Sequence, residues 1–181
     1  MSMAGTDGEE RGIARQVLVV MGVSGVGKTT IARVLDRKLH WPFQEGDELH
    51  SKANVDKMAS GRALTDEDRA PWLQAVADWI EARRQAGEPG VITCSALRRS
   101  YRDAVTGGHP GVRVVYLRAD RAVIAERLSQ RQHHYMPADL LESQLATLEE
   151  PAPDEHALTV QVHGGVDDIA AEIVARLRAD G

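Results

Sequence analysis

Short apolar runs alternate with longer segments of helical spacing along most of the chain. The runs are rich in β-branched residues and end at glycine or polar residues, as is typical of strands buried in a parallel sheet. They cover residues 16–21, 91–94, 112–117 and 158–162, and residues 41–45 form a weaker strand. Between them, apolar positions recur every three or four residues, which predicts helices. The predicted helices cover residues 29–39, 51–59, 96–105, 121–128, 140–148 and 169–177, and a further helix after Thr65 carries an apolar stripe over residues 72–80.

This alternation predicts an α/β fold, a three-layer α/β/α sandwich around a mostly parallel five-stranded sheet. Local signals refine the helix boundaries. Gly61 is expected to end the helix over 51–59 as a C-cap glycine. Thr65 and Asp68 resemble a capping box, with Asp in place of the usual Glu or Gln. Because proline sits badly inside a helix that begins at Asp66, we expect Pro71 itself to be the first helical residue.

Residues 15–181 suit one domain, which at this size buries about 70% of its unfolded surface and needs no disulfide or metal staple. Residues 1–14 lack periodicity and are expected to be a disordered tail. The single cysteine, Cys94, excludes an internal disulfide, and its place at an apolar strand end predicts a buried, unreactive thiol. No apolar run is long enough to span a membrane, and no signal peptide pattern is present, so we expect a cytoplasmic protein.

Charge draws attention to one region. The chain has 22 Lys and Arg against 27 Asp and Glu, a net charge of −5, which argues against a nucleic-acid or membrane-surface partner. Eight arginines nevertheless fall between Arg98 and Arg131, with only Asp103, Asp120 and Glu126 to balance them. Either these arginines are solvated on helix faces, or some of them bind anionic ligands.

A phosphate-binding motif follows the first predicted strand. Residues 22–29, Gly-Val-Ser-Gly-Val-Gly-Lys-Thr, match G-x-x-x-x-G-K-[ST]. The glycines let backbone N–H groups turn toward a triphosphate, and the following helix adds its positive dipole end. Lys28 is expected to reach the β- and γ-phosphates and Thr29 to ligate Mg²⁺. The expected ATP-binding residues here are Gly22, Val23, Ser24, Gly25, Val26, Gly27, Lys28, Thr29 and Thr30. A dinucleotide-binding loop fits poorly, because Thr30 stands where that motif needs a third glycine.

The rest of the chain favours a phosphotransferase over other nucleotide-binding classes. No Asp-x-x-Gly segment of a GTPase switch is present, and the strand over 91–94 lacks the terminal Asp of a motor ATPase. Asp47 and His50 follow the weak second strand, so they should lie at the carboxyl edge of the sheet, where ligands bind. Asp47 is the candidate for contacting an acceptor hydroxyl or the water shell of the metal, with a helix-capping role as the alternative. His50 could orient the acceptor, or it could be structural.

Longer segments extend the motif into a family pattern. From about Val17 to Val174 the chain resembles the small bacterial gluconate kinases (gluconokinases) of the shikimate-kinase-like P-loop group. The resemblance rests on residues 46–50 with Asn54 and 57–58, 64–73, 94–103, 134–137 and 145–151. The departures are Glu45, Ser51 and Tyr135, where the family commonly has Asp, Pro and Phe.

The resemblance implies a P-loop kinase domain that uses ATP and Mg²⁺ to phosphorylate D-gluconate at its 6-hydroxyl, for the pentose phosphate pathway, usually as a homodimer. It places the acceptor-binding segment at about 46–64 and a mobile lid at about 129–137. Another small-molecule kinase, for shikimate or a nucleoside monophosphate, and a non-catalytic ATP-binding regulator remain as alternatives.

The expected site residues follow from these roles. Arg98 and Arg102, four apart on one predicted helix face, should form the fork for the carboxylate of gluconate. Arg127 is expected near adenine and Arg131 on the transferred phosphate as the lid closes, with a surface salt-bridged pair as the alternative. The acceptor set implied by the resemblance is Asp47, His50, Lys57, Ser95, Arg98, Arg102 and His134, and the catalytic set is Lys28, Asp47 and Arg131.

Overall fold

The computed structural model describes residues 12–130 and 138–181 of the chain, and all five of its strands lie in one parallel sheet. The strand order is β2-β3-β1-β4-β5, and β1 pairs in parallel with β3 on one side and β4 on the other. The strands are β1 (Val17–Met21), β2 (Phe43–Gln44), β3 (Gly90–Thr93), β4 (Val112–Arg118) and β5 (Leu158–Gln161). The predicted fold class is confirmed, with a sheet that is wholly parallel.

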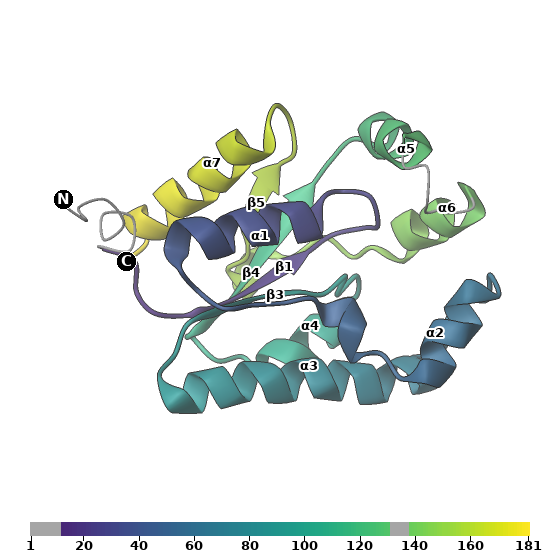
Figure 1. Cartoon of the computed structure of the whole chain (residues 1–181), viewed down its shortest axis with the longest axis horizontal. Helices are drawn as coiled ribbons and strands as arrows, with labels where there is room; N and C mark the ends of the chain where they lie inside the picture. Colours follow the sequence, from purple (N-terminus) through teal and green to yellow (C-terminus); the bar gives the residue numbers. More distant parts are fainter. Residues whose placement is uncertain (1–11, 131–137) are drawn as a thin grey trace, which may run out of the picture.

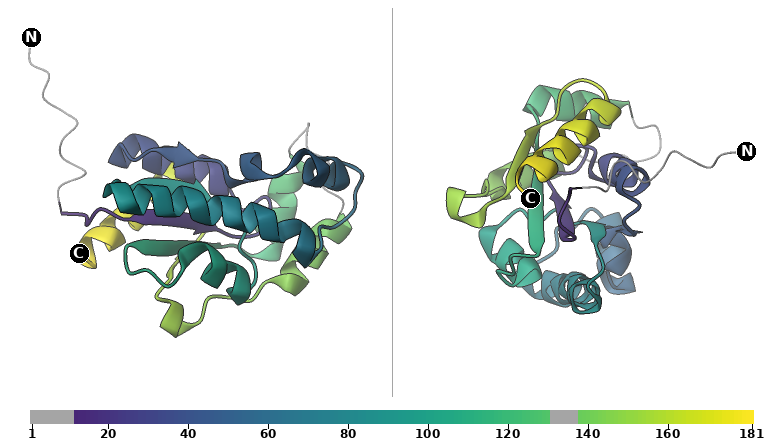
Figure 2. Two further views of the ribbon diagram at one scale, coloured as in Figure 1. Left: turned by 90° about the horizontal axis from the view of Figure 1, so that it is seen from below. Right: turned by 90° about the vertical axis from the view of Figure 1, so that its left-hand side faces the viewer.

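Helices cover both faces of this sheet (Figure 1). They are α1 (Lys28–Leu39), α2 (Lys52–Ala59), α3 (Asp66–Ala86), α4 (Arg99–Thr106), α5 (Arg121–Ser129), α6 (Ala138–Thr147) and α7 (Val166–Ala179). Two 3₁₀ turns, η1 (Gly46–Leu49) and η2 (Pro153–Glu155), lie in the connections. The layer of α1 and α7 lies on one side of the sheet and the layer of α3 and α4 on the other (Figures 1 and 2). None of the helices described is long and apolar enough to cross a membrane.

Burial on both faces explains why the strands read as continuous apolar runs. In β1 successive side chains alternate between two cores. Leu18 and Val20 pack into the core under α1 and α7, while Val17, Val19 and Met21 pack into the core under α3 and α4. All five side chains are at most 1% exposed, so the central strand holds the phosphate loop on a rigid base.

Two helix starts differ from prediction. Helix α3 begins at Asp66 and contains Pro71, because the Thr65–Asp68 capping box forms and fixes the earlier start. Proline at this sixth position removes only one N–H, so a single carbonyl of the first turn loses its helical partner. Helix α4 begins at Arg99 rather than at residue 96, because Ala96 has a φ of +46°, which no right-handed helix can contain.

Two smaller boundaries complete the comparison. Gly61 follows α2 with a φ of +78° and donates its N–H to the carbonyl of Met58, as a glycine that ends a helix does. Ile13 is 8% exposed and belongs to the core under α1 and α7, so the folded chain begins before the predicted Arg15. Residues 1–11 of the predicted tail lie outside the part of the chain described.

Because all five strands are parallel, their carboxyl ends meet at one edge of the sheet. The phosphate loop (residues 22–29) follows β1 there, residues 45–50 follow β2, and residues 94–98 follow β3. Helices α2, α5 and α6 lie at this end of the molecule, opposite the C-terminal end of α7 (Figure 1). The fold therefore brings the predicted donor and acceptor segments to the same edge.

Candidate active site

The phosphate loop has the backbone conformation that its glycines predict. Gly25 and Gly27 have φ values of +84° and +104°, which side-chain-bearing residues rarely adopt. A Cβ added at Gly25 would also lie 2.7 Å from Leu128 Cδ2 of α5. Gly27 is the N-cap of α1 and has no side chain with which to cap it, and the N-terminus of a helix that follows such a loop is where P-loop proteins bind an anion.

Side chains from distant elements surround this loop. Lys28 Nζ donates to the carbonyl oxygens of Gly22 (2.9 Å) and Val23 (3.2 Å), so the ammonium lies across the loop. Arg127 Nη1 donates to the carbonyl of Val26 at 2.9 Å, which places this guanidinium on the loop rather than in a surface ion pair. Lys28 and Arg127 therefore both lie beside the phosphate loop, where the sequence analysis expected them. Their roles toward a nucleotide stay predictions.

Gln144 of α6 is a contact of this loop that the sequence analysis missed. Its Oε1 accepts from the backbone N–H of Ser24 at 2.8 Å, and its Nε2 donates to Ser24 Oγ at 3.0 Å. The side-chain amide thus binds both polar groups of one loop residue 120 positions earlier in the chain. No sequence motif links the two residues, so only the fold reveals the pair.

A carboxylate stands beside the predicted metal-ligating hydroxyl. Thr29 Oγ1 donates to Glu45 Oε2 at 2.5 Å, and Thr93 Oγ1 at the end of β3 donates to Glu45 Oε1. Mg²⁺ prefers oxygen donors and commonly takes one or two carboxylates together with phosphate oxygens and water. A hydroxyl and a carboxylate at this distance therefore fit Mg²⁺ bound with a nucleotide. The sequence analysis noted Glu45 only as a departure from the family pattern and did not include it in the site.

Asp47 lies on η1, just beyond Glu45, and His50 directly follows this turn. Asp47 is exposed at the sheet edge, while His50 is half-buried and stacks on Trp72 with ring centroids 4.2 Å apart and an interplanar angle of 15°. Burial lowers the pKa of His50 below its ordinary value, and the nearby Asp47 carboxylate opposes this shift only in part. His50 is therefore neutral at pH 7, with its ring held by the aromatic contact.

The placement of η1 depends on a close backbone approach at Gly46. A Cβ there would lie 1.8 Å from the carbonyl oxygen of Thr93, so only glycine fits. The Gly46 carbonyl accepts from Trp72 Nε1 at 2.8 Å, and its N–H donates to Thr93 Oγ1 at 3.0 Å. These contacts fix the start of η1 against β3 and α3, and Asp47 with it.

Lys57, predicted to bind the acceptor, is engaged in an ion pair within the fold. Its Nζ lies 2.5 Å from Asp68 Oδ2, the carboxylate that also caps α3, and both side chains are about one quarter exposed. The hydrogen bond from Lys57 lowers the pKa of Asp68 to about 2. Asn54 adds a second link from α2 to α3, donating to the Asp68 carbonyl at 2.7 Å. In this structure Lys57 joins α2 to α3, and its predicted contact with the acceptor stays a prediction.

Arg98 faces the acceptor side together with a residue that the sequence analysis did not select. Its Nη1 lies 3.2 Å from Asp66, and Arg69 of α3 approaches the same carboxylate at 3.8 Å. Both guanidiniums lie within 6 Å of the ring centroid of Tyr101, and the Tyr101 hydroxyl donates to Asp66. That hydrogen bond lowers the pKa of Asp66, whose carboxylate the two arginines also contact.

Arg102 is not placed with Arg98, and the prediction that both guanidiniums point at one ligand is wrong. Arg98 is the extended N-cap of α4, whereas Arg102 lies inside the helix with a side chain only 1% exposed. Arg102 Nε and Nη2 donate to Glu155 at 2.5 and 3.0 Å, and Nη1 donates to the carbonyl of Ala96 at 3.0 Å. Arg98 and Arg102 do not share a helix face because the positive φ of Ala96 delays the start of α4 to Arg99.

The other arginines of the basic segment that the structure describes are also paired. Arg99 binds Asp154 at 2.6 Å, and the other ion pairs are Arg113–Asp180, Arg118–Glu150 and Arg121–Glu142. The local positive charge is thus largely matched by acids that come from later parts of the chain. Of the two possibilities that the sequence left open for this segment, ion pairing within the fold accounts for most of the described arginines, while Arg127 contacts the phosphate loop and Arg98 contacts Asp66 at the start of α3.

Ser95 is half-buried in the loop after β3. Its carbonyl accepts from the N–H of Gly22 at 3.4 Å, so this loop contacts the start of the phosphate loop. Cys94 beside it is 1% exposed, and burial raises the pKa of its thiol to about 12, as expected for an unreactive cysteine.

Thr30 is exposed in the first turn of α1. Arg131, His134 and most of the predicted lid lie outside the described residues.

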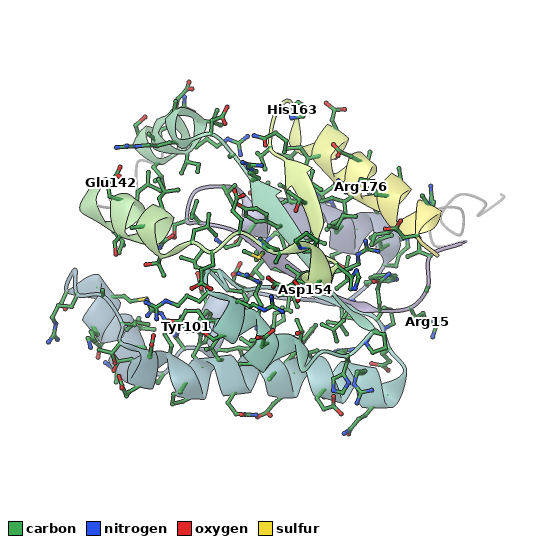
Figure 3. All side chains as sticks on the ribbon, turned by 180° about the vertical axis from the view of Figure 1, so that it is seen from behind. Arg15, Tyr101, Glu142, Asp154, His163 and Arg176 are labelled. Atoms are coloured by element: carbon green, nitrogen blue, oxygen red, sulfur yellow. The ribbon has the colours of Figure 1, made fainter. Side chains whose placement is uncertain are left out.

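A cavity of about 910 Å³ lies away from this site, lined by residues of α4, β4, η2 and the ends of the chain. Its lining includes Arg15, Arg113 and Asp180 but no residue of the phosphate loop or of η1. Figure 3 shows Arg15 at the end of the molecule opposite Tyr101, which lies toward α2 and α6. We therefore place the functional site by its chemistry, at the carboxyl edge.

A phosphate loop at the carboxyl edge of a parallel sheet, faced by carboxylates and arginines, places the chain in the class of P-loop kinases. Residues 17–151 match a family model described as an AAA domain. A gluconokinase of Gluconobacter oxydans is 46% identical, covering 94% of this chain and 96% of that protein. The thermoresistant gluconokinase of Escherichia coli is 40% identical, with coverages of 87% and 91%. The chain belongs to the gluconokinase family.

A solved structure agrees with this assignment. The crystal structure of a gluconokinase from Sinorhizobium meliloti superposes with a TM-score of 0.83 at 40% identity, covering 93% of this chain and 96% of that one. The similarity therefore extends over most of both chains.

Proposed function

We propose that the protein transfers the γ-phosphoryl group of ATP to the 6-hydroxyl of D-gluconate, giving 6-phosphogluconate and ADP. The single observation that carries this proposal is the meeting of the phosphate loop with Asp47 and the Arg69–Arg98 pair at one sheet edge. Family membership at up to 46% identity supports gluconate as the acceptor. A sugar acid offers both groups that such a site needs, a nucleophilic hydroxyl and a carboxylate.

On the donor side, the loop N–H groups and the dipole of α1 hold the triphosphate, and Lys28 moves from the loop carbonyls onto the β- and γ-phosphates. Thr29 and Glu45 are the residues that would hold Mg²⁺, which when bound neutralises charge on the phosphates. Arg127, whose Nη1 donates to the carbonyl of Val26 in the loop, is proposed to lie near the adenine of the bound nucleotide. Arg131 is proposed to meet the transferred phosphate.

On the acceptor side, Asp47 orients the 6-hydroxyl and accepts its proton as the oxygen bonds to phosphorus. The bond between the γ-phosphorus and the bridging oxygen breaks, and ADP leaves with that electron pair. Neutral His50 can donate or accept a hydrogen bond to a neighbouring hydroxyl. Ser95, between the two loops, is proposed as a further polar contact of the acceptor.

The carboxylate end of gluconate is assigned to Arg69 and Arg98. Both guanidiniums already contact a carboxylate, that of Asp66, which also accepts from the Tyr101 hydroxyl. An incoming carboxylate can share or replace this partner with the same charge-assisted geometry. Arg69 thereby takes the place in the fork that the sequence analysis gave to Arg102.

A coupled assay of ADP release, run with gluconate, shikimate, AMP or no acceptor, tests the proposal. Gluconate-dependent ADP formation is expected, with little release in the other three reactions. Release that depends on shikimate or AMP would favour another small-molecule kinase. Equal release without any acceptor would contradict a kinase function. The homodimer and the cytoplasmic location implied by the resemblance stay predictions, the first open to sedimentation analysis.

A further inference from the structure

The loop that joins β3 to α4 contains a buried residue in an unfavourable backbone conformation. Ala96 has a φ of +46° and is fully buried, and residues with a Cβ seldom occupy this left-handed region. Ser95, directly before Ala96, and Arg98, two residues after it, are the residues proposed to meet the acceptor. Something in the surrounding structure must hold this loop in its observed shape.

Arg102 is the side chain that binds the loop. Its Nη1 donates to the carbonyls of Ala96 (3.0 Å) and Leu97 (3.4 Å), the two residues that follow Ser95. Its other two nitrogens donate to Glu155, so each guanidinium nitrogen has an acceptor. With side chains 1% and 8% exposed, the Arg102–Glu155 pair is buried and cannot reach an acceptor without being dismantled.

Glu155 is itself anchored. Its Oε1 also accepts from the backbone N–H of Ala152 at 2.9 Å, and the hydrogen bond from Arg102 lowers the pKa of its carboxyl. The same connection contacts the loop again at Glu149, whose N–H donates to the Leu97 carbonyl at 2.8 Å and whose carboxylate accepts from the Arg99 N–H at 2.7 Å. The connection between α6 and β5 thus holds the acceptor loop at several points.

We propose that the Arg102–Glu155 pair is a positioning device for the acceptor loop. It holds Ala96 in its left-handed conformation, and so sets where Ser95 and Arg98 stand relative to Asp47. Arg102 is a positioning residue and not a ligand of the acceptor. This inference rests on the proposed function, because it assigns the loop to acceptor binding.

Two conservative variants test the device. Glu155→Gln keeps the size of the side chain but removes its charge, and Arg102→Lys keeps the charge but removes the planar fork. Each is expected to raise KM for gluconate about tenfold while leaving KM for ATP within about twofold. Arg102→Ala is avoided, because an unpartnered buried Glu155 would test folding instead of positioning.

The chain offers a matched control in the neighbouring ion pair. Arg99–Asp154 joins the same helix to the same connection, but its side chains are 46% and 64% exposed. Arg99→Met removes this pair and leaves the Arg99 N–H in place. Its kinetic constants are expected to stay within about twofold of wild type.

A rescue variant separates positioning from mere stability. Glycine adopts a positive φ without strain, so Ala96→Gly added to Arg102→Lys should return KM for gluconate to within about threefold of wild type. If Glu155→Gln lowers the melting temperature but leaves KM for gluconate unchanged, the pair only stabilises the fold and the inference is wrong. If Arg102→Lys raises this KM and Glu155→Gln does not, Arg102 binds the acceptor directly, which also overturns it.

Hydrogen exchange provides a readout that does not depend on the acceptor. Amides of residues 94–100 are expected to exchange faster in Glu155→Gln than in wild type or Arg99→Met, measured by mass spectrometry without ligand. Equal exchange in all three proteins would contradict the device. A wild-type protein without gluconate-dependent activity, but with this exchange difference, would instead contradict the proposed function and leave the positioning of the loop supported.

Discussion

The phosphate loop and the arginine-rich segment that begins at Arg98 differ in how well the sequence alone predicts their structure. The phosphate loop performs its role through backbone N–H groups, and its glycines, Lys28 and Thr29 lie within eight consecutive residues. Its conformation and its place at the sheet edge agree with the motif. The arginine segment has the charge of an anion site, yet most of its guanidiniums bind acids of the same chain.

The difference lies in what determines each group's surroundings. Backbone geometry over a short loop follows from local residues, above all from glycine. A long charged side chain is directed by whichever partner the fold brings to it, and for Arg102 that partner is 53 residues away. Local motifs therefore predict donor-side chemistry well, while acceptor-side arginines need the structure.

The largest effect is expected at Asp47, the carboxylate proposed to contact the acceptor hydroxyl. Asp47→Asn should lower kcat by about 10²–10⁴-fold, because the acceptor hydroxyl loses its proton acceptor. Steady-state kinetics measures this, with Glu48→Gln on the same 3₁₀ turn as the control. If both variants retain full kcat, Asp47 does not act on the acceptor hydroxyl.

Lys28→Ala tests the locally encoded region. Removing its charge from the transferring phosphate should reduce kcat about 10²–10³-fold, with the fold kept as judged by circular dichroism and thermal melting. Lys38→Ala, near the far end of the same helix, should behave as wild type. An unchanged kcat in Lys28→Ala would disprove the assignment of the phosphate loop.

Glu45→Gln examines a donor-side residue that the motif does not contain. The Mg²⁺ concentration needed for half-maximal rate should rise, by up to about a hundredfold, because the neutral amide is a weaker partner for the cation. Titrating the rate with Mg²⁺ at fixed ATP measures the change. No shift would mean that Glu45 serves only to join Thr29 to Thr93.

Arg98→Ala sharpens the contrast within the basic segment. Loss of one charge-assisted contact should lower kcat/KM for gluconate about tenfold to a hundredfold, with KM for ATP nearly unchanged. Arg69→Ala should act in the same direction, and Arg121→Ala, whose ion pair is exposed, should have no effect on kinetics. Equal losses in all three variants would indicate a general effect of charge rather than a defined fork.

The smallest effect concerns pH and the Lys57–Asp68 pair. The pKa of Asp68 falls from 3.8 to about 2 in the folded protein, so its contribution to stability is present above pH 4 and fades as pH falls toward 2. Asp68→Asn should therefore lower the urea midpoint slightly at pH 7, and this difference should shrink below about pH 4. A difference that stays constant down to pH 3 would show that the carboxylate charge is not involved.

Much of the fold followed from the sequence because buried strands and amphipathic helices leave strong periodic patterns. The order of elements and the parallel sheet are confirmed, and so is the capping box at Thr65. The start of α4 was wrong because residues 96–98 have ordinary helical composition, and only the tertiary contacts of Ala96 impose its positive φ. Local propensity loses to tertiary context there.

The site divides in the same way. The motif predicted the phosphate loop, and the position of Asp47 after the weak second strand predicted that it lies at the same edge of the sheet. Glu45 was missed because β2 has only two residues and gives little signal, and Gln144 because its partner is 120 positions away. Arg69 was missed because nothing in the sequence distinguishes an arginine that faces a site from one on a solvated helix face.

The central claim is that phosphate from ATP is transferred to the 6-hydroxyl of gluconate. Gluconate labelled with ¹³C at carbon 6 tests it directly, because a phosphate ester at that position splits the carbon signal through coupling to ³¹P. After incubation with the protein, ATP and Mg²⁺, the labelled carbon is expected to appear as a phosphorus-coupled doublet while ADP accumulates. An unsplit carbon 6 signal despite complete conversion of ATP to ADP would contradict the account.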